Sequence, residues 1–282
     1  MWPLGAELGE GPVWSEREAA LWFVDIKGRA LHRFRPGDGT RTSLAAPDQP
    51  GFAWPAEDGR LVVGLPRRLA CCDPVTGEFS PLAEIEPDRP GNRINDASVD
   101  LAGRLWFGTM DDAESLETGA LYSWSGALRR HDDGIAITNG PCVSPDGRKF
   151  YHTDTLNRVL YAYDLDSAGM LSNKRELLRI EADAGWPDGT TIDAEGCLWV
   201  ALWGGWAVRR YSPDGRLIDM LRLPCANVTK VAFGGADRRD FFITTAAKGL
   251  SPAERAAQPL AGGLFFLRAG VSGLPVMEAQ IT

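Results

Sequence analysis

The feature that most constrains the fold of this chain is a short repeated motif, in which a turn leads directly into an apolar strand. Its clearest copies are residues 103–107 (GRLWF) and 196–200 (GCLWV), each preceded by an acidic turn residue. Weaker copies place Trp22, Val62, Phe150 and Phe242 at the position of Trp106 and Trp199. The spacing between these anchors is roughly 40 to 49 residues, which is typical of one four-stranded propeller blade.

Short β-favouring runs follow each anchor and end at Pro, Gly or Asp, as in residues 208–211 (VRRY) ahead of Pro213-Asp214-Gly215. The pattern predicts an all-β fold, a six-bladed β-propeller. Such a ring spreads one continuous core over all its blades and needs no linker, so residues 1–282 are predicted to form a single domain. Residues 246–260 are expected to form an inserted loop or a short helix in the last blade.

Composition excludes several classes of function. A net charge of -8 without a basic cluster argues against binding to nucleic acid or to an anionic membrane surface. No apolar run approaches the roughly 18 residues of a membrane span, and the first residues lack the features of a secretory signal. A soluble, cytoplasmic protein is therefore expected. The five scattered cysteines are predicted to be reduced and packed in blade cores.

Common catalytic motifs are missing as well. His32, His131 and His152 stand at unrelated places in the repeat, so a histidine-rich zinc site is not expected. The chain has neither a Gly-Xaa-Ser-Xaa-Gly elbow nor a P-loop, which removes the usual parts of serine hydrolases and NTPases.

Four polar residues share one register of the repeat. Glu10, Asn95, Asn139 and Asp188 each stand roughly 11 or 12 positions ahead of an anchor, whereas Gly51 and Val231 are expected there in blades two and six. Equivalent positions of a propeller converge on its axis, which predicts an oxygen-rich axial pocket suited to a metal ion. The alternative for Asn139-Gly140 or Asp188-Gly189 taken alone is an ordinary turn.

Further candidates flank this register. In an extended segment Arg93 points the same way as Asn95, although it could also form a surface ion pair with Asp88 or Asp96. Asp111 and Asp112 follow a predicted strand and could reach over the pocket or belong to a solvated loop. Four tryptophans are expected in loops around the pocket mouth, where sugars often stack: Trp54, Trp186, Trp203 and Trp206.

Four segments in order carry a resemblance over nearly the whole chain: residues 8–14 (LGEGPVW), 93–96 (RIND), 137–141 (ITNGP) and 187–189 (PDG). They resemble the regucalcin-like family, also called senescence marker protein, gluconolactonase and luciferin-regenerating enzyme. The resemblance implies a six-bladed propeller with one divalent cation held by Glu10, Asn139 and Asp188. It also implies substrate contacts from Arg93, Asn95 and an acidic residue after Gly-Thr-Met, which is placed at Asp112.

Residues 21–27 (LWFVDIK), 151–155 (YHTDT) and 202–205 (LWGG) resemble the bacterial sugar-lactonase branch of that family, especially xylonolactonases. The resemblance implies hydrolysis of a sugar lactone, such as xylono-, arabinono-, galactono- or glucono-lactone, to the aldonic acid. Asp188 is expected to serve as catalytic base as well as metal ligand. Oxygen ligands suit Ca²⁺, Mg²⁺ or Mn²⁺, and the resemblance also admits Zn²⁺ and Fe²⁺.

Two other functions remain open at this level. A metal site on this scaffold could serve a phosphotriesterase-type hydrolase, and a propeller could act without catalysis as a calcium-binding or protein-binding platform. A binding platform, however, has no need of an axial polar cluster. The residues do not determine the oligomeric state or the lactone.

Overall fold

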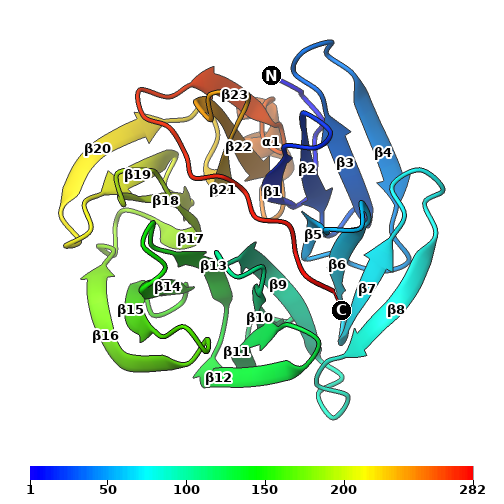
Figure 1. Ribbon diagram of the computed structural model, residues 1–282. Coiled ribbons are helices and arrows are strands. Elements are labelled where there is room, and N and C mark those ends of the chain that lie inside the picture. The colour runs from blue at the N-terminus through cyan, green and yellow to red at the C-terminus, as the bar shows by residue number, and fades with distance from the viewer. Residues whose placement is uncertain (282) are drawn as a thin grey trace.

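The computed structural model describes residues 1–281, and it confirms the predicted all-β propeller of six blades (Figure 1). Thr282, the last residue of the predicted domain, lies outside the described residues. Each blade is an antiparallel meander whose first strand lies next to the ring axis. The first three blades are β1 (Gly9–Ser15), β2 (Ala20–Asp25), β3 (Ala30–Phe34) and β4 (Arg41–Ala45); β5 (Phe52–Pro55), β6 (Leu61–Leu65), β7 (Arg68–Cys72) and β8 (Phe79–Glu84); and β9 (Asn92–Val99), β10 (Leu105–Asp111), β11 (Gly119–Trp124) and β12 (Leu128–Ile135).

The other three blades continue the ring in sequence order. They are β13 (Thr138–Val143), β14 (Lys149–Asp154), β15 (Val159–Leu165) and β16 (Leu171–Arg179); β17 (Trp186–Ile192), β18 (Leu198–Trp203), β19 (Ala207–Tyr211) and β20 (Leu217–Arg222); and β21 (Asn227–Gly234), β22 (Asp240–Ala246) and β23 (Phe265–Arg268). Innermost strands such as β1 and β21 are buried along their whole length, whereas outermost strands such as β20 are mostly exposed. Polar side chains on an inner strand therefore require a specific reason.

Apolar side chains pack between neighbouring blades, and within residues 1–281 each of the six blade contacts has its own cluster. Five of the predicted anchors face the following blade, but Phe150 faces the preceding one, with its ring centroid 4.6 Å from that of Trp106. Tyr151 is the true anchor of blade four, in the cluster shared with blade five. The prediction was wrong by one residue, a shift that moves a strand side chain to the other face. The five cysteines are buried and unpaired, as predicted.

The acidic turn residues of the two clearest repeats explain why the motif recurs. One carboxylate oxygen of Asp100 accepts backbone N–H bonds of its turn, and the other accepts the indole N–H of Trp106 at 2.9 Å. Asp193 does the same in blade five, where its second oxygen accepts the indole N–H of Trp199 at 2.9 Å. Each aspartate thus orders a turn and satisfies a buried tryptophan at the same time.

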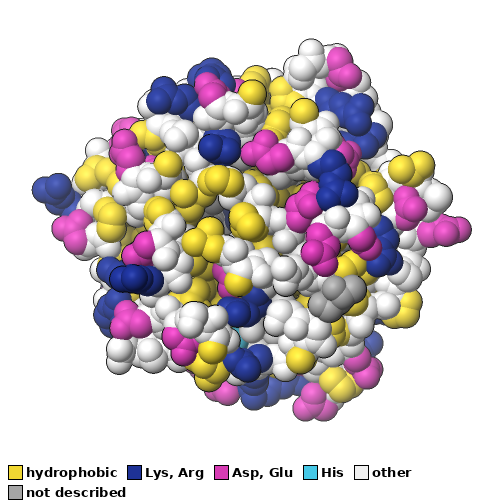
Figure 2. Space-filling view, viewed as in Figure 1, with side chains coloured by type: hydrophobic (Ala, Val, Ile, Leu, Met, Phe, Trp, Pro, Cys, Tyr) yellow, Lys and Arg dark blue, Asp and Glu magenta, His cyan; other side chains and the backbone are white. Residues whose placement is uncertain are grey.

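The two ends of the chain complete the ring. Trp2 exchanges two backbone hydrogen bonds with Leu264, of 2.8 and 2.9 Å, which adds a third, minimal pairing to the three-stranded sixth blade. After β23 the C-terminal segment crosses one face of the ring and pairs at Ala279 with Ala56 (Figure 1). On this face basic and acidic side chains are interspersed around the rim (Figure 2).

The predicted insertion at residues 246–260 contains a short helix, α1 (Pro252–Ala257). Ser251 caps it by accepting the backbone N–H of Glu254, whose side chain in turn accepts the N–H of Ser251, a capping box. The described part of the chain contains no helix long and apolar enough to cross a membrane.

One buried group predicts a pH dependence of stability. His152 is completely buried, neither ring nitrogen has a hydrogen-bond partner within residues 1–281, and burial lowers its pKa to about 4. Between about pH 6.5 and pH 4 the unfolded chain takes up a proton that the folded protein does not, so acidification lowers the free energy of unfolding across this range. Compared with a His152→Leu variant, the wild type is expected to lose up to about 1.4 kcal/mol more per pH unit within this range. Denaturant unfolding at several pH values checks this. If the free energies of unfolding of the two proteins changed in parallel with pH, the prediction would be contradicted.

Candidate active site

The four polar residues of the shared register converge on one cavity at the ring axis. Its volume is 360 Å³, within the range of small-molecule sites. The cavity opens where the inner strands begin, at the opposite end of the channel from the C-terminal segment. Its lining consists of Leu8, Glu10, Arg93, Asn95, Met110, Glu114, Ile137, Asn139, Thr155, Leu156, Trp186, Asp188, Trp203, Lys248 and Gly249.

The backbone of each inner strand turns its polar residue toward the axis at a β-bulge. In blades one and four the bulge contains Gly11 and Gly140, with φ of 55° and 54°. A Cβ on Gly140 would also lie 2.5 Å from the backbone nitrogen of Thr190, so neither the conformation nor the space admits another residue. In blade six the bulge residue is Thr229. The prediction of Val231 was wrong, because Val231 packs between blades five and six.

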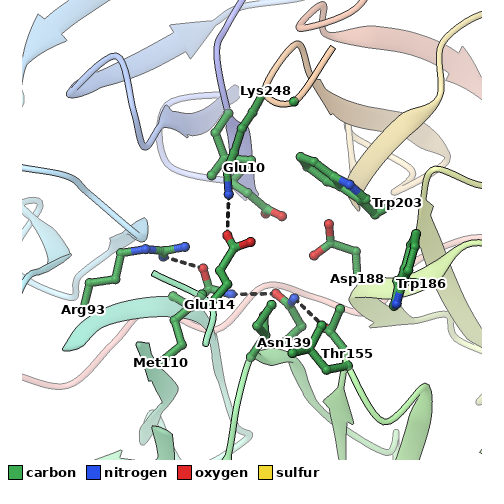
Figure 3. Close-up of a pocket in the computed structure, with 15 residues that line it drawn as sticks. Glu10, Arg93, Met110, Glu114, Asn139, Thr155, Trp186, Asp188, Trp203 and Lys248 are labelled. Atoms are coloured by element: carbon green, nitrogen blue, oxygen red, sulfur yellow. Dashed lines mark hydrogen bonds and ion pairs between the residues drawn. The ribbon is translucent and has the colours of Figure 1, made fainter. Parts of the chain in front are cut away.

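A chain of hydrogen bonds fixes the amides in the site (Figure 3). Arg93 Nη1 donates to Asn95 Oδ1 at 2.6 Å, which confirms that the two side chains point the same way. Asn95 Nδ2 donates to Asn139 Oδ1 at 2.9 Å, and Asn139 Nδ2 donates to Thr155 Oγ1 at 3.0 Å. The Asn139 carbonyl oxygen accepts one bond and keeps a second lone pair for a ligand.

Asp112 lies behind Arg93, outside the cavity lining. Its Oδ1 accepts from Arg93 Nε and from Lys27 Nζ, both at 2.7 Å, so the partner of Arg93 is neither Asp88 nor Asp96. Burial alone would raise the pKa of Asp112, but the hydrogen bond from Lys27 and the charge of Arg93 lower it to about 2. Asp111 caps the following loop through Ser115. The acidic residue of this loop that lines the cavity is Glu114, two positions beyond the predicted one.

The two axial carboxylates carry the strongest electrostatic signal. Glu10 and Asp188 are 5% and 7% exposed, and their carboxylates point into the same space (Figure 3). Burial, together with the nearby charge of Asp96, raises the pKa of Glu10 to about 8. Burial and then the charge of Glu10 raise the pKa of Asp188 well above its usual range. The cause is desolvation plus mutual repulsion of like charges.

A divalent cation fits this arrangement. Within residues 1–281 no lysine or arginine forms an ion pair with Glu10 or Asp188, although an uncompensated buried carboxylate is costly. The other possible ligand atom beside the two carboxylates, Asn139 Oδ1, is also an oxygen, and hard cations prefer oxygen ligands. Three oxygen ligands from three blades would leave coordination positions of a bound cation free for small molecules.

An ion pair that the sequence did not reveal lies beneath the site. Lys230 Nζ, from β21, pairs with Asp96 Oδ1 and donates to the Ala97 carbonyl at 3.1 Å. Asp96 Oδ2 accepts the backbone N–H of Gly140 at 2.8 Å. The pair therefore ties blades three, four and six together next to Asn139. Asp96 was visible beside Asn95, but no local pattern relates Lys230 to Asp96, because the two residues are 134 positions apart in the chain.

Two of the four predicted mouth tryptophans, Trp186 and Trp203, line the cavity. The other two predictions were wrong. Trp54 lies at the opposite end of the channel and donates its indole N–H to the Met277 carbonyl at 2.9 Å. Trp206 stands on the turn between β18 and β19 and is 39% exposed, outside the lining. Trp54 belongs to strand β5 and not to a loop, and the turn that contains Trp206 does not bring it to the lining, and loop composition shows neither.

A second acidic group, formed by Asp193, Glu195 and Cys197, lies away from this cavity. Both oxygens of Asp193 are already occupied by backbone N–H groups, the Trp199 indole and Arg210. Burial raises the pKa of the Cys197 thiol, which disfavours the thiolate that a metal would need. The axial carboxylates are the better candidates for a metal.

Comparison with known proteins agrees with this geometry. Residues 8–247 match the family model described as the SMP-30/Gluconolactonase/LRE-like region. The chain is 38% identical over 270 residues to a 6-deoxy-6-sulfogluconolactonase of Pseudomonas putida, covering 94% of this chain and 92% of that protein. It is 35% identical over 273 residues to an L-arabinolactonase of Azospirillum brasilense, covering 95% and 90%.

Among solved structures, a calcium-binding regucalcin from Agrobacterium tumefaciens matches with a TM-score of 0.94 and 31% identity, over 98% of this chain and 95% of that one. Family model, relatives and solved structure span the blades that build the cavity. The chain therefore belongs to the SMP-30/gluconolactonase/LRE-like family.

Proposed function

We propose that this protein is a metal-dependent sugar lactonase, which hydrolyses an aldonolactone to the aldonic acid. The observation that carries the proposal is the pair of buried carboxylates, Glu10 and Asp188, facing one cavity beside a fixed row of hydrogen-bonding groups. Relatives named 6-deoxy-6-sulfogluconolactonase and L-arabinolactonase support the substrate class. The name regucalcin and the description calcium-binding of a solved relative support a divalent cation.

Glu10, Asn139 and Asp188 would hold the cation, and Ca²⁺, Mg²⁺, Mn²⁺, Zn²⁺ and Fe²⁺ are the candidates. When bound, such a cation supplies Lewis-acid polarisation of the lactone carbonyl and makes nearby water more acidic. The other steps fall to the chain itself.

Arg93 and Asn95 are the residues assigned to orient the substrate. Arg93 is 3% exposed and held by Asp112, so its remaining N–H donors are aimed with little loss of conformational entropy. Asp188 is the residue assigned to accept a proton from the attacking water. Trp186 and Trp203 give the sugar ring an apolar wall.

A direct test is hydrolysis of a panel of aldono-1,4- and 1,5-lactones, followed by pH-stat, with protein that is stripped of metal and then resupplied with single cations. Cation-dependent turnover of one or two sugar lactones is expected. Aryl phosphotriesters in the same assay provide the comparison with a phosphotriesterase. Folded protein that turns over no lactone with any cation would refute the proposal.

A further inference from the structure

Lys248 is a cation at the cavity wall that the proposed hydrolysis does not use. Its Nζ pairs with Glu114 Oε1 across the mouth of the cavity and lies 5.9 Å from the centroid of the Trp203 ring (Figure 3). The two paired side chains remain 29% and 37% exposed. A pair that is this exposed contributes little to stability, so a ligand can displace either partner at little cost.

The backbone of Lys248 is fixed although its side chain is not. Its N–H donates to the Glu7 carbonyl at 2.8 Å, and its own carbonyl accepts from Asn227 Nδ2 at 2.9 Å. Glu114 stands in the loop after β10 with a φ of 58°, and its N–H donates to the Asp111 carbonyl at 3.0 Å. Lys248 therefore combines a fixed backbone with a long, flexible side chain. Its ammonium group can turn from Glu114 toward a ligand.

The charges lining the cavity single out Lys248 further. The lining contains three carboxylates (Glu10, Glu114 and Asp188) and two cations (Arg93 and Lys248). Arg93 is committed to Asp112 and Asn95, whereas the carboxylate partner of Lys248 within residues 1–281 is Glu114 alone. A divalent cation would neutralise Glu10 and Asp188 and make the lined space net positive, which favours an anionic ligand.

We propose that Lys248 is a specificity-determining residue, which pairs with an acidic substituent of the lactone and makes acidic sugar lactones the preferred substrates. The shared chemistry is an exocyclic anion, either a sulfonate or a carboxylate, held by a charge-assisted hydrogen bond. This inference rests on the proposed lactonase function and adds the substrate class to it.

The test compares kcat/KM for glucono-lactone with that for its 6-sulfo and 6-carboxylate counterparts, in the wild type, Lys248→Met and Lys248→Arg. Lys248→Met is expected to lower kcat/KM for the acidic lactones about 10- to 100-fold, mainly through KM, and that for the neutral lactone less than about 2-fold. Lys248→Arg should restore most of the loss. Comparison of kcat/KM for the 6-sulfo and the 6-carboxylate lactone shows which anion is preferred.

Lys174→Met is a matched control, because Lys174 also pairs with a carboxylate, Asp132, and lies over an aromatic ring, that of Tyr161, but stands on the exposed outer strand β16. It should leave the ratio of acidic to neutral turnover unchanged. Glu114→Gln should raise this ratio, since it removes the competing anion. Equal losses of kcat/KM for acidic and neutral lactones in Lys248→Met would overturn this inference but not the proposed function. A wild type that does not prefer acidic lactones would do the same. Absence of turnover on every lactone would overturn the proposed function with it.

Discussion

Replacing Asp188 with alanine is expected to abolish lactone hydrolysis, lowering kcat/KM by about 10³-fold or more, while the propeller stays folded. The substitution removes one of the two buried carboxylates and the proposed base. It should not cost stability in the metal-free protein, because burial and the charge of Glu10 already raise the pKa of Asp188 and disfavour its charged form. Turnover by pH-stat and thermal unfolding of the same sample measure the two effects separately.

Two near-isosteric variants distinguish a base from a ligand. If Asp188 acts as a base, Asp188→Asn stays inactive even when the cation is saturating. Glu10, as a ligand only, behaves differently: Glu10→Gln should need more cation but recover much of kcat when it is supplied. Near-normal hydrolysis by folded Asp188→Ala would show that the assignment is wrong.

Removal of the metal is the second change with a large expected effect. Chelation should reduce lactone turnover to background, and one added divalent cation should restore it. The same cation should stabilise the fold, because it relieves the repulsion between Glu10 and Asp188. At a concentration of 100 times Kd the gain is about 2.7 kcal/mol, or about 5 °C in Tm.

The double variant Glu10→Gln, Asp188→Asn keeps the shape of the site but removes both charges, so it is the control for this shift. It should show little response of Tm to the cation and should be at least as stable as the wild type without it. Full activity in chelated protein with no metal detectable by elemental analysis would refute metal dependence.

Much of the site could be predicted because a propeller converts sequence register into position. Glu10, Asn95, Asn139 and Asp188 lie far apart in the chain, yet each precedes a blade anchor by nearly the same distance, and equivalent inner-strand residues meet at the axis. The choice of Phe150 instead of Tyr151 as anchor did not affect the prediction of the axial residues. A shift of one residue changes the face toward which the anchor side chain points, but it leaves the position of the blade unchanged.

Side-chain partners in the loops were less predictable. The choice between Asp112 and Glu114 depends on how the loop after β10 folds back: Asp112 meets Lys27 and Arg93, and Glu114 meets Lys248. These partners are 85, 19 and 134 residues away, so no local pattern relates them.

By itself, the sequence determined the number of blades and the polar residues at the axis, since these follow from local alternation and a fixed repeat length. The tertiary structure alone decided how the ring closes, through Trp2 and Leu264. It also decided which basic side chain, that of Lys248, stands at the cavity mouth. The physical reason is that ring closure and the Lys248–Glu114 pair join residues from distant blades. Their contacts exist only once the inner strands have packed around the axis.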